Sequence, residues 1–186
     1  MSLRVLVIPE DPTYNGYILK PLVERLLADC GKPRAKVVLL VNPRLNGFDD
    51  AKCAIREELA NRYGHFDLWL FLPDADRAKG LEGLEKEMGG REIRLLCCAA
   101  QPEVEAWLIA GHKTKIGIGW SAVRSHPRLK EEVFEPFLTR HGDRRGAGEG
   151  RERLLDETLK NLTGLLELCP ELRDLKRRIL ATLRAN

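Results

Sequence analysis

The sequence lacks any apolar run long enough to cross a bilayer, and its N-terminus shows no signal-peptide pattern. We therefore expect neither a membrane-spanning nor a secreted protein. The chain has 186 residues, of which 44% are hydrophobic and 32% are charged, values that are typical of a soluble globular domain. A chain of this length can bury a substantial core without disulfides or a structural metal.

Cysteine is scarce and forms no metal-binding pattern. The five cysteines include no CxxC pair, and Cys97 and Cys98 lie in an apolar run, where free cysteine behaves as a small hydrophobic residue. A zinc site would need a second pair of ligands, which the sequence does not offer. We therefore expect free thiols and a reducing, cytoplasmic location.

Aromatic residues make up only 6% of the chain and do not alternate with its basic residues. This argues against a stacking platform for single-stranded nucleic acid, so any nucleic-acid contact is expected to involve backbone phosphates. The four histidines show neither HxH nor HExxH spacing, and no serine lies in a nucleophile-elbow pattern. Histidine-ligated metals and serine-hydrolase chemistry are therefore not indicated.

The net charge of +3 is small but unevenly distributed. Residues 1–111 hold 15 Lys and Arg against 17 Asp and Glu, a balance of −2. Residues 112–186 hold 16 against 11, a balance of +5. The first part could house an acidic site, whereas the second could attract a polyanion such as nucleic acid.

Four short apolar runs alternate with patterns typical of amphipathic helices. Uninterrupted apolar strands separated by helices indicate a parallel sheet that is covered on both faces. We therefore predict an α/β fold, Rossmann-like, with a mainly parallel sheet of about four strands in residues 1–111. The expected strands are Arg4–Ile8, Lys36–Val41, Phe66–Leu72 and Ile93–Ala99, and the expected helices end at Gly31, Gly64, Gly89 and Gly111. Asp49 is expected to cap the second of these helices, and Pro102 is expected to start the fourth.

Residues 112–186 are expected to pack on the same domain. Residues 112–150 are basic and follow no regular pattern. Apolar positions then repeat at helical spacing over Arg151–Leu168 and Pro170–Leu183, with a hinge at Cys169-Pro170. This C-terminal helical hairpin would either cover the sheet domain or form a homodimer contact.

Acidic residues follow three of the four predicted strands. Glu10 follows the first strand, Asp74 and Asp76 follow the third, and Glu103 and Glu105 follow the fourth. Because the carboxyl ends of parallel strands meet at one edge of a sheet, these side chains should lie close together. Several carboxylates tolerate one another only around a cation, and Mg²⁺ prefers such oxygen ligands. The second strand differs, since it ends in Asn42-Pro43-Arg44.

Some of the acidic residues in this region also have a purely structural explanation. Asp76 could cap the helix that follows it, and Glu103 near a helix start would be favoured by the helix dipole. Asp11 before Pro12 is typical of a turn. A single cap explains only one aspartate of the Asp74/Asp76 pair, which favours a metal or phosphate role for that pair.

Basic residues near these motifs are candidates for phosphate binding. Arg77 and Lys79 follow the aspartate pair, and Arg144, Arg145 and Arg151 belong to or follow a glycine-rich loop at 141–150. That loop opens a helix, where backbone amides favour phosphate. It lacks the GKS/T ending of a P-loop, so a nucleotide-binding loop is not indicated, and such loops are more often flexible connectors.

The order of these motifs resembles the TOPRIM domain of topoisomerases, primases and OLD-type nucleases, in which a glutamate follows the first strand and a DxD motif follows the third. The stretch Glu103–Leu108 is similar to a Glu-Ala-Trp-Leu element of bacterial TOPRIM-like proteins of the RloB type. The tail Arg151–Ile179 also resembles these proteins, so the resemblance covers most of the chain. One difference is Asp11-Pro12, which stands where the TOPRIM pattern has a glycine.

This resemblance implies a nuclease-like protein that uses Mg²⁺ or Mn²⁺ to cleave phosphodiester bonds. Glu10 would act as general acid or base and contact the metal, Asp74 and Asp76 would hold the metal, and Glu105 would add a ligand or orient the others. With Glu103, five carboxylates would suffice for two metals. Such relatives are often encoded beside ATPases, which implies an ATPase partner and a role in phage defence.

Two other functions fit the same motifs. The chain could be a metal- or nucleotide-binding regulatory subunit of an ATPase complex that carries out no chemistry. Nucleotide-sugar transferases also place a DxD motif after a strand, but this chain leaves little room for an acceptor domain.

Overall fold

The computed structural model describes residues 2–75 and 79–185 and contains one sheet of four parallel strands. The strand order is β2-β1-β3-β4, so β1 and β3 are central and β2 and β4 are edges. This confirms the predicted α/β class, although three of the strands are shorter than the sequence indicated. The strands are β1 (Arg4–Pro9), β2 (Lys36–Leu39), β3 (Leu68–Leu72) and β4 (Leu95–Cys97).

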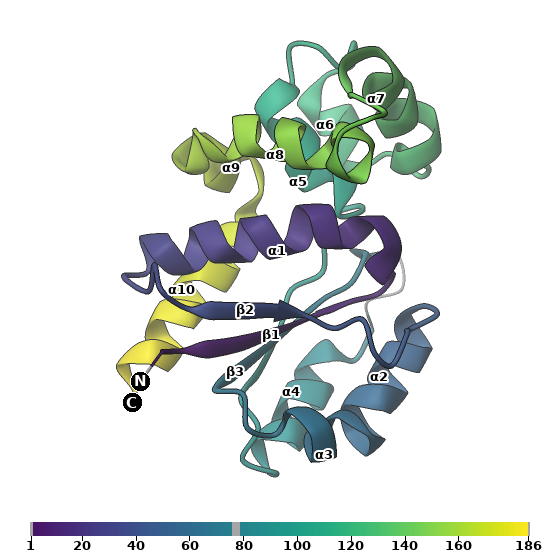
Figure 1. Ribbon diagram of the computed structural model, residues 1–186. Coiled ribbons are helices and arrows are strands. Elements are labelled where there is room, and N and C mark those ends of the chain that lie inside the picture. Colours follow the sequence, from purple (N-terminus) through teal and green to yellow (C-terminus); the bar gives the residue numbers. More distant parts are fainter. Residues whose placement is uncertain (1, 76–78, 186) are drawn as a thin grey trace.

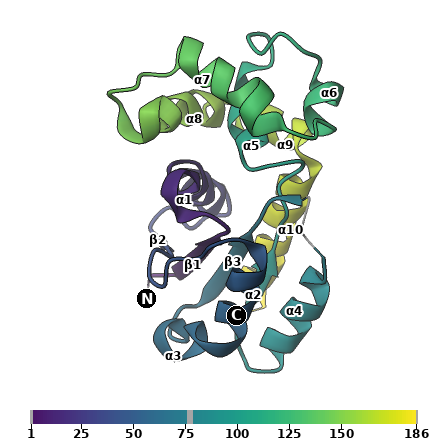
Figure 2. The same ribbon diagram turned by 90° about the vertical axis from the view of Figure 1, so that its right-hand side faces the viewer.

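Helices cover both faces of the sheet (Figures 1 and 2). On one face lie α1 (Pro12–Asp29) and α10 (Pro170–Arg184), and on the other lie α2 (Phe48–Glu57), α3 (Leu59–Tyr63) and α4 (Leu81–Gly89). Successive strand residues alternate between the two faces, which explains the continuous apolar runs. Val5, Val7, Leu68 and Leu70 pack on the α1 side, and Leu6, Ile8, Trp69 and Phe71 pack on the α2 side.

A third layer of short helices lies on the outer side of α1, at the top of Figure 1. Residues 112–150, which we expected to be irregular, contain several of these helices, each seven residues or fewer. Val123, Phe134 and Phe137 are buried in the core shared with α1. The layer comprises α5 (Glu105–Ile109), η2 (Ala110–His112), α6 (Trp120–Arg124), the π-helical η3 (Lys130–Phe134), α7 (Glu135–His141), η4 (Ala147–Gly150), α8 (Arg151–Leu159) and α9 (Leu162–Leu168).

Helix α1 begins at Pro12, six residues before the apolar repeat, whose first residue is Ile18. Asp11 accepts a hydrogen bond from the Thr13 N–H at 2.8 Å and so caps the helix start, with Pro12 as its first residue. Pro21 therefore lies inside the helix and not in its first turn. The helix ends as predicted, with Gly31 in the left-handed conformation at φ +79°.

Other predicted helix limits were wrong. The single helix expected over Arg151–Leu168 is divided into α8 and α9, because the Asn161 side chain accepts a hydrogen bond from the Gly164 N–H and starts a new helix. Asp49 does not cap α2, which begins at Phe48. The helix expected to start at Pro102 begins at Glu105.

The C-terminal helix α10 buries its apolar stripe within the chain. Leu172, Leu175 and Ile179 are at most 1% exposed and join the core that contains α1. The stripe that suggested a dimer contact is therefore used in packing α10 against the sheet domain. Over residues 2–75 and 79–185, we find no helix with the length and apolar character to cross a membrane.

Candidate functional site

Four carboxylates lie at the carboxyl edge of the sheet, and we call Glu10, Asp74, Glu103 and Glu105 the acidic rim. Asp74 extends β3 by pairing with Ala100 beyond β4. Its backbone N–H donates to Glu10 Oε2 at 3.3 Å, and its own Oδ1 accepts from the Val104 N–H at 2.8 Å. These bonds join the ends of the first, third and fourth strands, as the sequence predicted for a parallel sheet.

Glu105 is the most deeply buried carboxylate of the acidic rim. It lies at the start of α5 and is 1% exposed, and its Oε1 has no hydrogen-bond partner. The Lys130 Nζ is 3.8 Å from this oxygen. Glu103, two residues earlier, accepts the Lys130 N–H through Oε2 at 2.7 Å. Both glutamates are thus tied to the first turn of η3.

Burial and mutual repulsion favour the protonated forms of these carboxyl groups. Burial raises the pKa of Asp74 to about 8, and the charges of Glu105, Glu10 and Glu103 act in the same direction, against the hydrogen bond from Val104. Burial likewise raises the pKa of Glu103 and of Glu105. The acidic rim is therefore short of positive charge, although Lys130 and Arg151 oppose the shift at Glu105.

Two basic residues beside the acidic rim were missed by the sequence prediction. Arg44 donates to Thr13 Oγ1 at 3.3 Å, and Lys130 contacts Glu105. Burial raises the pKa of Asp11, but the hydrogen bond from Thr13 and the charges of Lys130 and Arg44 outweigh it and lower that pKa overall. Arg44 follows β2, and the carboxyl ends of parallel strands share one edge of the sheet, so its position beside the acidic residues was predictable. No pattern in the sequence pointed to Lys130.

Of the other predicted site residues, Asp76 and Arg77 lie outside the described residues. Lys79 is exposed ahead of α4, and its carbonyl accepts a hydrogen bond from Lys52. Arg144 and Arg145 are exposed in the turn between α7 and η4.

Arg151, also predicted to bind phosphate, is a buried residue of the third layer. Only 1% of it is exposed, and its guanidinium lies 4.3 Å from the ring centroid of Tyr14 and 5.2 Å from that of Phe134. It donates to Glu135 Oε1 at 3.0 Å and to the Gly148 carbonyl at 3.1 Å. Arg151 therefore joins η4 and α8 to α1, and its charge acts on Glu105 of the acidic rim.

The glycine-rich loop before α8 is closely packed. Gly148 and Gly150 are buried and have φ values of +57° and +94°. A Cβ on Gly148 would lie 2.6 Å from the Tyr17 ring, and one on Gly150 would lie 2.3 Å from the Asp143 nitrogen. Backbone conformation and close approach thus both require glycine here.

The acidic rim does not form a complete metal cage from the described side chains. Among residues 2–75 and 79–185, no three His, Cys, Asp or Glu side chains are grouped so that they could hold a metal ion. Asp76, the second aspartate of the predicted ligand set, is not among these residues. The oxygen chemistry, with a Glu105 Oε1 that accepts no hydrogen bond, nevertheless suits a hard divalent cation.

Comparison of the chain with protein-family models, curated proteins and solved structures gives no match.

Proposed function

We propose that this protein is a Mg²⁺- or Mn²⁺-dependent phosphodiesterase of the TOPRIM-like type that acts on nucleic acid. One observation carries the proposal, namely the convergence of four carboxylates on one sheet edge, where the buried Glu105 Oε1 accepts no hydrogen bond and has only the Lys130 ammonium at 3.8 Å. Structural capping accounts for one Asp74 oxygen, which accepts the Val104 N–H. It does not account for Glu105, whose burial costs free energy unless a cation or proton compensates its charge.

In this proposal, Asp74, Glu105 and the predicted ligand Asp76 would hold the cation. Glu103 would hold the start of η3 in place by accepting the Lys130 N–H. Bound there, a divalent metal would polarise a phosphoryl oxygen and lower the pKa of a coordinated water. Glu10 accepts the Asp74 N–H and is half-buried, so its carboxylate is held at the edge as a proton acceptor. A contact between Lys130 or Arg44 and phosphate would offset the substrate's negative charge.

The test is calorimetric titration of Mn²⁺ and Mg²⁺, followed by cleavage assays on DNA and RNA. Asp74→Asn keeps an oxygen that can accept the Val104 N–H while removing the charge, so we expect a folded protein with metal affinity reduced at least about tenfold. Glu167→Gln, an exposed position on α9, is the matched control and should bind like the wild type. Wild-type protein that binds no metal, with or without an oligonucleotide, would refute the proposal.

A regulatory role without chemistry is the second candidate. It is favoured by Lys130, whose ammonium group already supplies a positive charge 3.8 Å from Glu105. A protein of this kind would bind metal or nucleotide but cleave neither DNA nor RNA under any metal tested. An ATPase would then be the partner to seek.

A further inference from the structure

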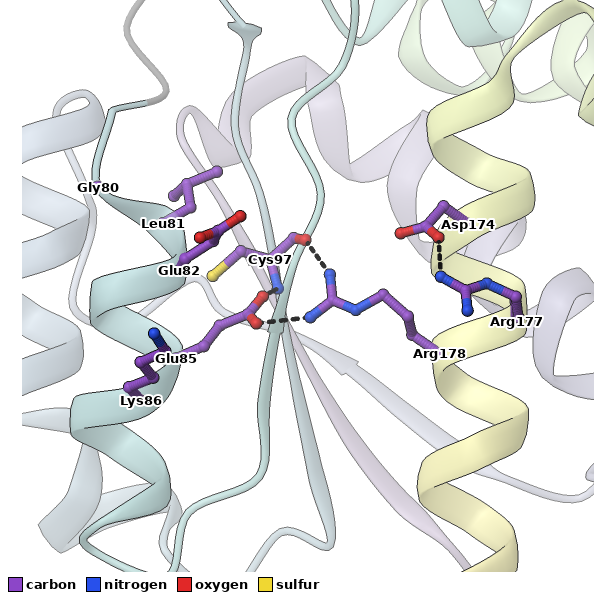
Figure 3. Close-up of a pocket in the computed structure, with 9 residues that line it drawn as sticks. All are labelled: Gly80, Leu81, Glu82, Glu85, Lys86, Cys97, Asp174, Arg177 and Arg178. Carbon is purple, nitrogen blue, oxygen red and sulfur yellow. Dashed lines mark hydrogen bonds and ion pairs between the residues drawn. The ribbon is translucent and has the colours of Figure 1, made fainter.

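The cavity shown in Figure 3 lies at the β4 edge of the sheet and carries no unbalanced charge. It measures about 770 Å³, and three acidic and three basic residues line it. Arg178 of α10 donates to Glu85 of α4 at 2.6 Å and to the Cys97 carbonyl at 3.0 Å, so this ion pair spans the cavity. Arg177 pairs with Asp174 on the same helix. Because both arginines already have acidic partners, this cavity is not suited to a charged ligand.

A smaller cavity, of about 250 Å³, adjoins the acidic rim, and we call it the rim pocket. Its wall includes Glu103 of the rim and Ala75, which directly follows Asp74. The rest of the wall comes from residues 101–102, which follow β4, and residues 125–127, which follow α6. A cavity of this size is smaller than those that hold drug-sized ligands, so it suits a single ring. A molecule held at the acidic rim could therefore place such a ring in the rim pocket.

Hydrogen bonds join the three segments that form the rim pocket. The Ala75 N–H donates to the Pro102 carbonyl at 3.0 Å. Gln101 Nε2 donates to the Arg124 carbonyl at 3.2 Å, and the Arg124 guanidinium donates back to the Gln101 carbonyl at 2.7 Å. Arg124 is itself fixed by its two hydrogen bonds to Glu171. The pocket is thus formed before any ligand binds, which lowers the entropic cost of binding.

Glu103 is the one acidic residue among the described residues that line the rim pocket, and no lysine or arginine accompanies it. A phosphate there would meet only the negative charge of Glu103, so the pocket disfavours the charged part of a nucleotide. The lining also includes Ala75, Pro102, His126 and Pro127. Aromatic and apolar side chains of this kind stack against the bases in base-binding sites. The rim pocket therefore suits a flat, uncharged ring.

Most polar groups of the rim pocket accept hydrogen bonds. Glu103 uses Oε2 to accept a backbone N–H of η3, and Gln101 uses Nε2 to donate to a backbone carbonyl. Over residues 2–75 and 79–185, no group donates to Glu103 Oε1 or Gln101 Oε1, so both oxygens remain acceptors. The Ser125 hydroxyl donates to a carbonyl of α6 at 3.1 Å and can therefore only accept a further bond. His126 adds a donor, because its Nδ1 accepts the Arg128 N–H at 3.2 Å and leaves the proton on Nε2. A ring that carries N–H donors fits this pattern best.

We propose that the rim pocket holds the base of a nucleotide whose phosphate lies at the acidic rim, and that it prefers bases with an exocyclic amino group. The inference rests on the proposed function and adds a base contact to the phosphate contacts expected from the composition. The amino group of cytosine, adenine or guanine would donate to Glu103 Oε1, since carboxylates accept from the cytosine amino group in nucleic-acid recognition. Uracil and thymine have a carbonyl oxygen where cytosine has its amino group, and the Glu103 carboxylate repels that oxygen.

The test is an NMR titration of the isotope-labelled full chain, without metal, with cytidine and with uridine. These nucleosides lack phosphate, and cytidine carries an amino group where uridine carries a carbonyl oxygen. They therefore probe the rim pocket without requiring metal binding or cleavage. We expect cytidine to shift the amide resonances of Ser125 and His126. It should bind at least about fivefold more tightly than uridine, the effect of one hydrogen bond to a charged group.

Two variants locate the binding. Glu103→Gln keeps an oxygen for the η3 N–H but loses the charge, so the ratio of the two affinities should fall toward about one. Ser125→Phe places a ring in the rim pocket and should weaken the binding of both nucleosides at least about tenfold. Ser121→Phe is the matched control and should bind like the wild type, since Ser121 is exposed on α6 and does not line the pocket. Equal affinities for cytidine and uridine in the wild type, or undiminished cytidine binding by folded Ser125→Phe protein, would overturn the proposal.

A second titration distinguishes nucleic acid from a free nucleotide. It is made in Ca²⁺, which supplies a positive charge that carboxylate oxygens coordinate. An oligothymidine with one cytosine should bind more tightly than the unsubstituted strand and shift the same resonances. Cytidine binding without this difference would assign the rim pocket to a free nucleotide and overturn the proposal. If both titrations succeed in a protein that shows no Mg²⁺- or Mn²⁺-dependent cleavage, the rim pocket stands and only the proposed function fails.

Discussion

At the scale of single residues, Asp74 carries a proton that a metal ion would displace. Its pKa is raised to about 8, chiefly by burial, so near pH 7 most metal-free molecules hold this carboxyl neutral. A bound cation needs the carboxylate, so binding should release about one proton near pH 7 and almost none near pH 9.

This proton release is measurable as a dependence of the calorimetric heat on the buffer's ionisation enthalpy. Below the pKa of Asp74, the Mn²⁺ affinity should rise by up to about tenfold for each unit of increase in pH, because the proton that competes with the metal is lost. Asp74→Asn should abolish the dependence. Metal binding near pH 7 without proton uptake by the buffer would show that Asp74 is not a ligand.

Lys130 stabilises the metal-free acidic rim. Its ammonium group is the cation 3.8 Å from buried Glu105, so Lys130→Met should lower the free energy of unfolding by about 1–3 kcal/mol. Mn²⁺ should then raise the melting temperature more in this variant than in the wild type, since it replaces the missing charge. Lys130→Arg keeps the charge and is the control. An equal increase in melting temperature on addition of Mn²⁺ in all three proteins would contradict this role of Lys130.

The positions of Glu10 and Asp74 were predictable because strand ends in a parallel sheet share an edge. Arg44 was predictable by the same rule, because it follows the second strand. The sequence analysis used it only to show that this strand does not end in an acidic residue. Lys130 was not, since it comes from a segment with no regular apolar pattern and reaches the edge through packing of η3. Arg151 followed a glycine-rich loop that suggested phosphate, whereas its surroundings are aromatic rings and acids.

At the scale of elements, one carboxylate joins three helices. Glu171 at the start of α10 accepts from Trp107 of α5 at 2.9 Å and from both terminal nitrogens of Arg124 on α6, at 2.6 and 2.7 Å. Both ionic partners are about four-fifths buried, and the contact is bidentate, which strengthens it relative to a surface pair.

A double-mutant cycle with Arg124→Met and Glu171→Gln should therefore give a coupling free energy of about 1–2 kcal/mol. The exposed Arg177–Asp174 pair on α10 is the matched comparison and should give less than about 0.5 kcal/mol. The measurement is the free energy of unfolding in urea. Equal coupling in the two cycles would mean that Glu171 does not hold the third layer to α10.

His112 makes the contact between η2 and α8 sensitive to pH. Burial lowers its pKa, and its Nε2 lies 2.9 Å from the Leu154 carbonyl, an arrangement that suits neutral imidazole donating from Nε2. The unfolded residue titrates at about 6.5, so its contribution to stability is complete above that pH and lost as the pH falls toward the lower folded value.

Stability should therefore decline as the pH falls below about 6.5 in the wild type and less steeply in His112→Gln. His65→Gln, at an exposed position, should keep the wild-type slope. Chemical denaturation at each pH provides the measurement. Identical slopes in all three proteins would exclude His112 as the cause.

The elements themselves were predictable where they are long and apolar. Strand β3 buries an uninterrupted run of apolar side chains, and α1 buries apolar side chains that recur at helical spacing. The sequence therefore specifies both elements strongly. Helices α6 and α7 were missed because each spans only five to seven residues, too few turns to show a period. The division between α8 and α9 depends on the Asn161 cap, a local hydrogen bond that the leucine repeat conceals.

At the scale of the whole molecule, the third layer connects the exposed turn that holds Arg144 and Arg145 to the acidic rim. Arg144 lines a hollow with Glu135 and Glu149, the two acids that also contact Arg151. Arg151 in turn packs on Tyr14, four residues after Glu10. A polyanion that binds the exposed turn holding Arg144 would therefore lie on the layer that supports the site.

This arrangement predicts how nucleic-acid binding depends on salt. If Arg144 and Arg145 contact backbone phosphates, Arg144→Gln/Arg145→Gln should weaken binding to every nucleic-acid sequence alike. The slope of log affinity against log salt concentration should become less negative by about 1–2. Arg62→Gln/Arg91→Gln removes the same charge from the opposite side of the sheet and should leave that slope unchanged. Fluorescence anisotropy with a labelled duplex over a range of salt gives both quantities. Equal effects of the two double variants would mean that net charge alone, and not this turn, attracts the nucleic acid.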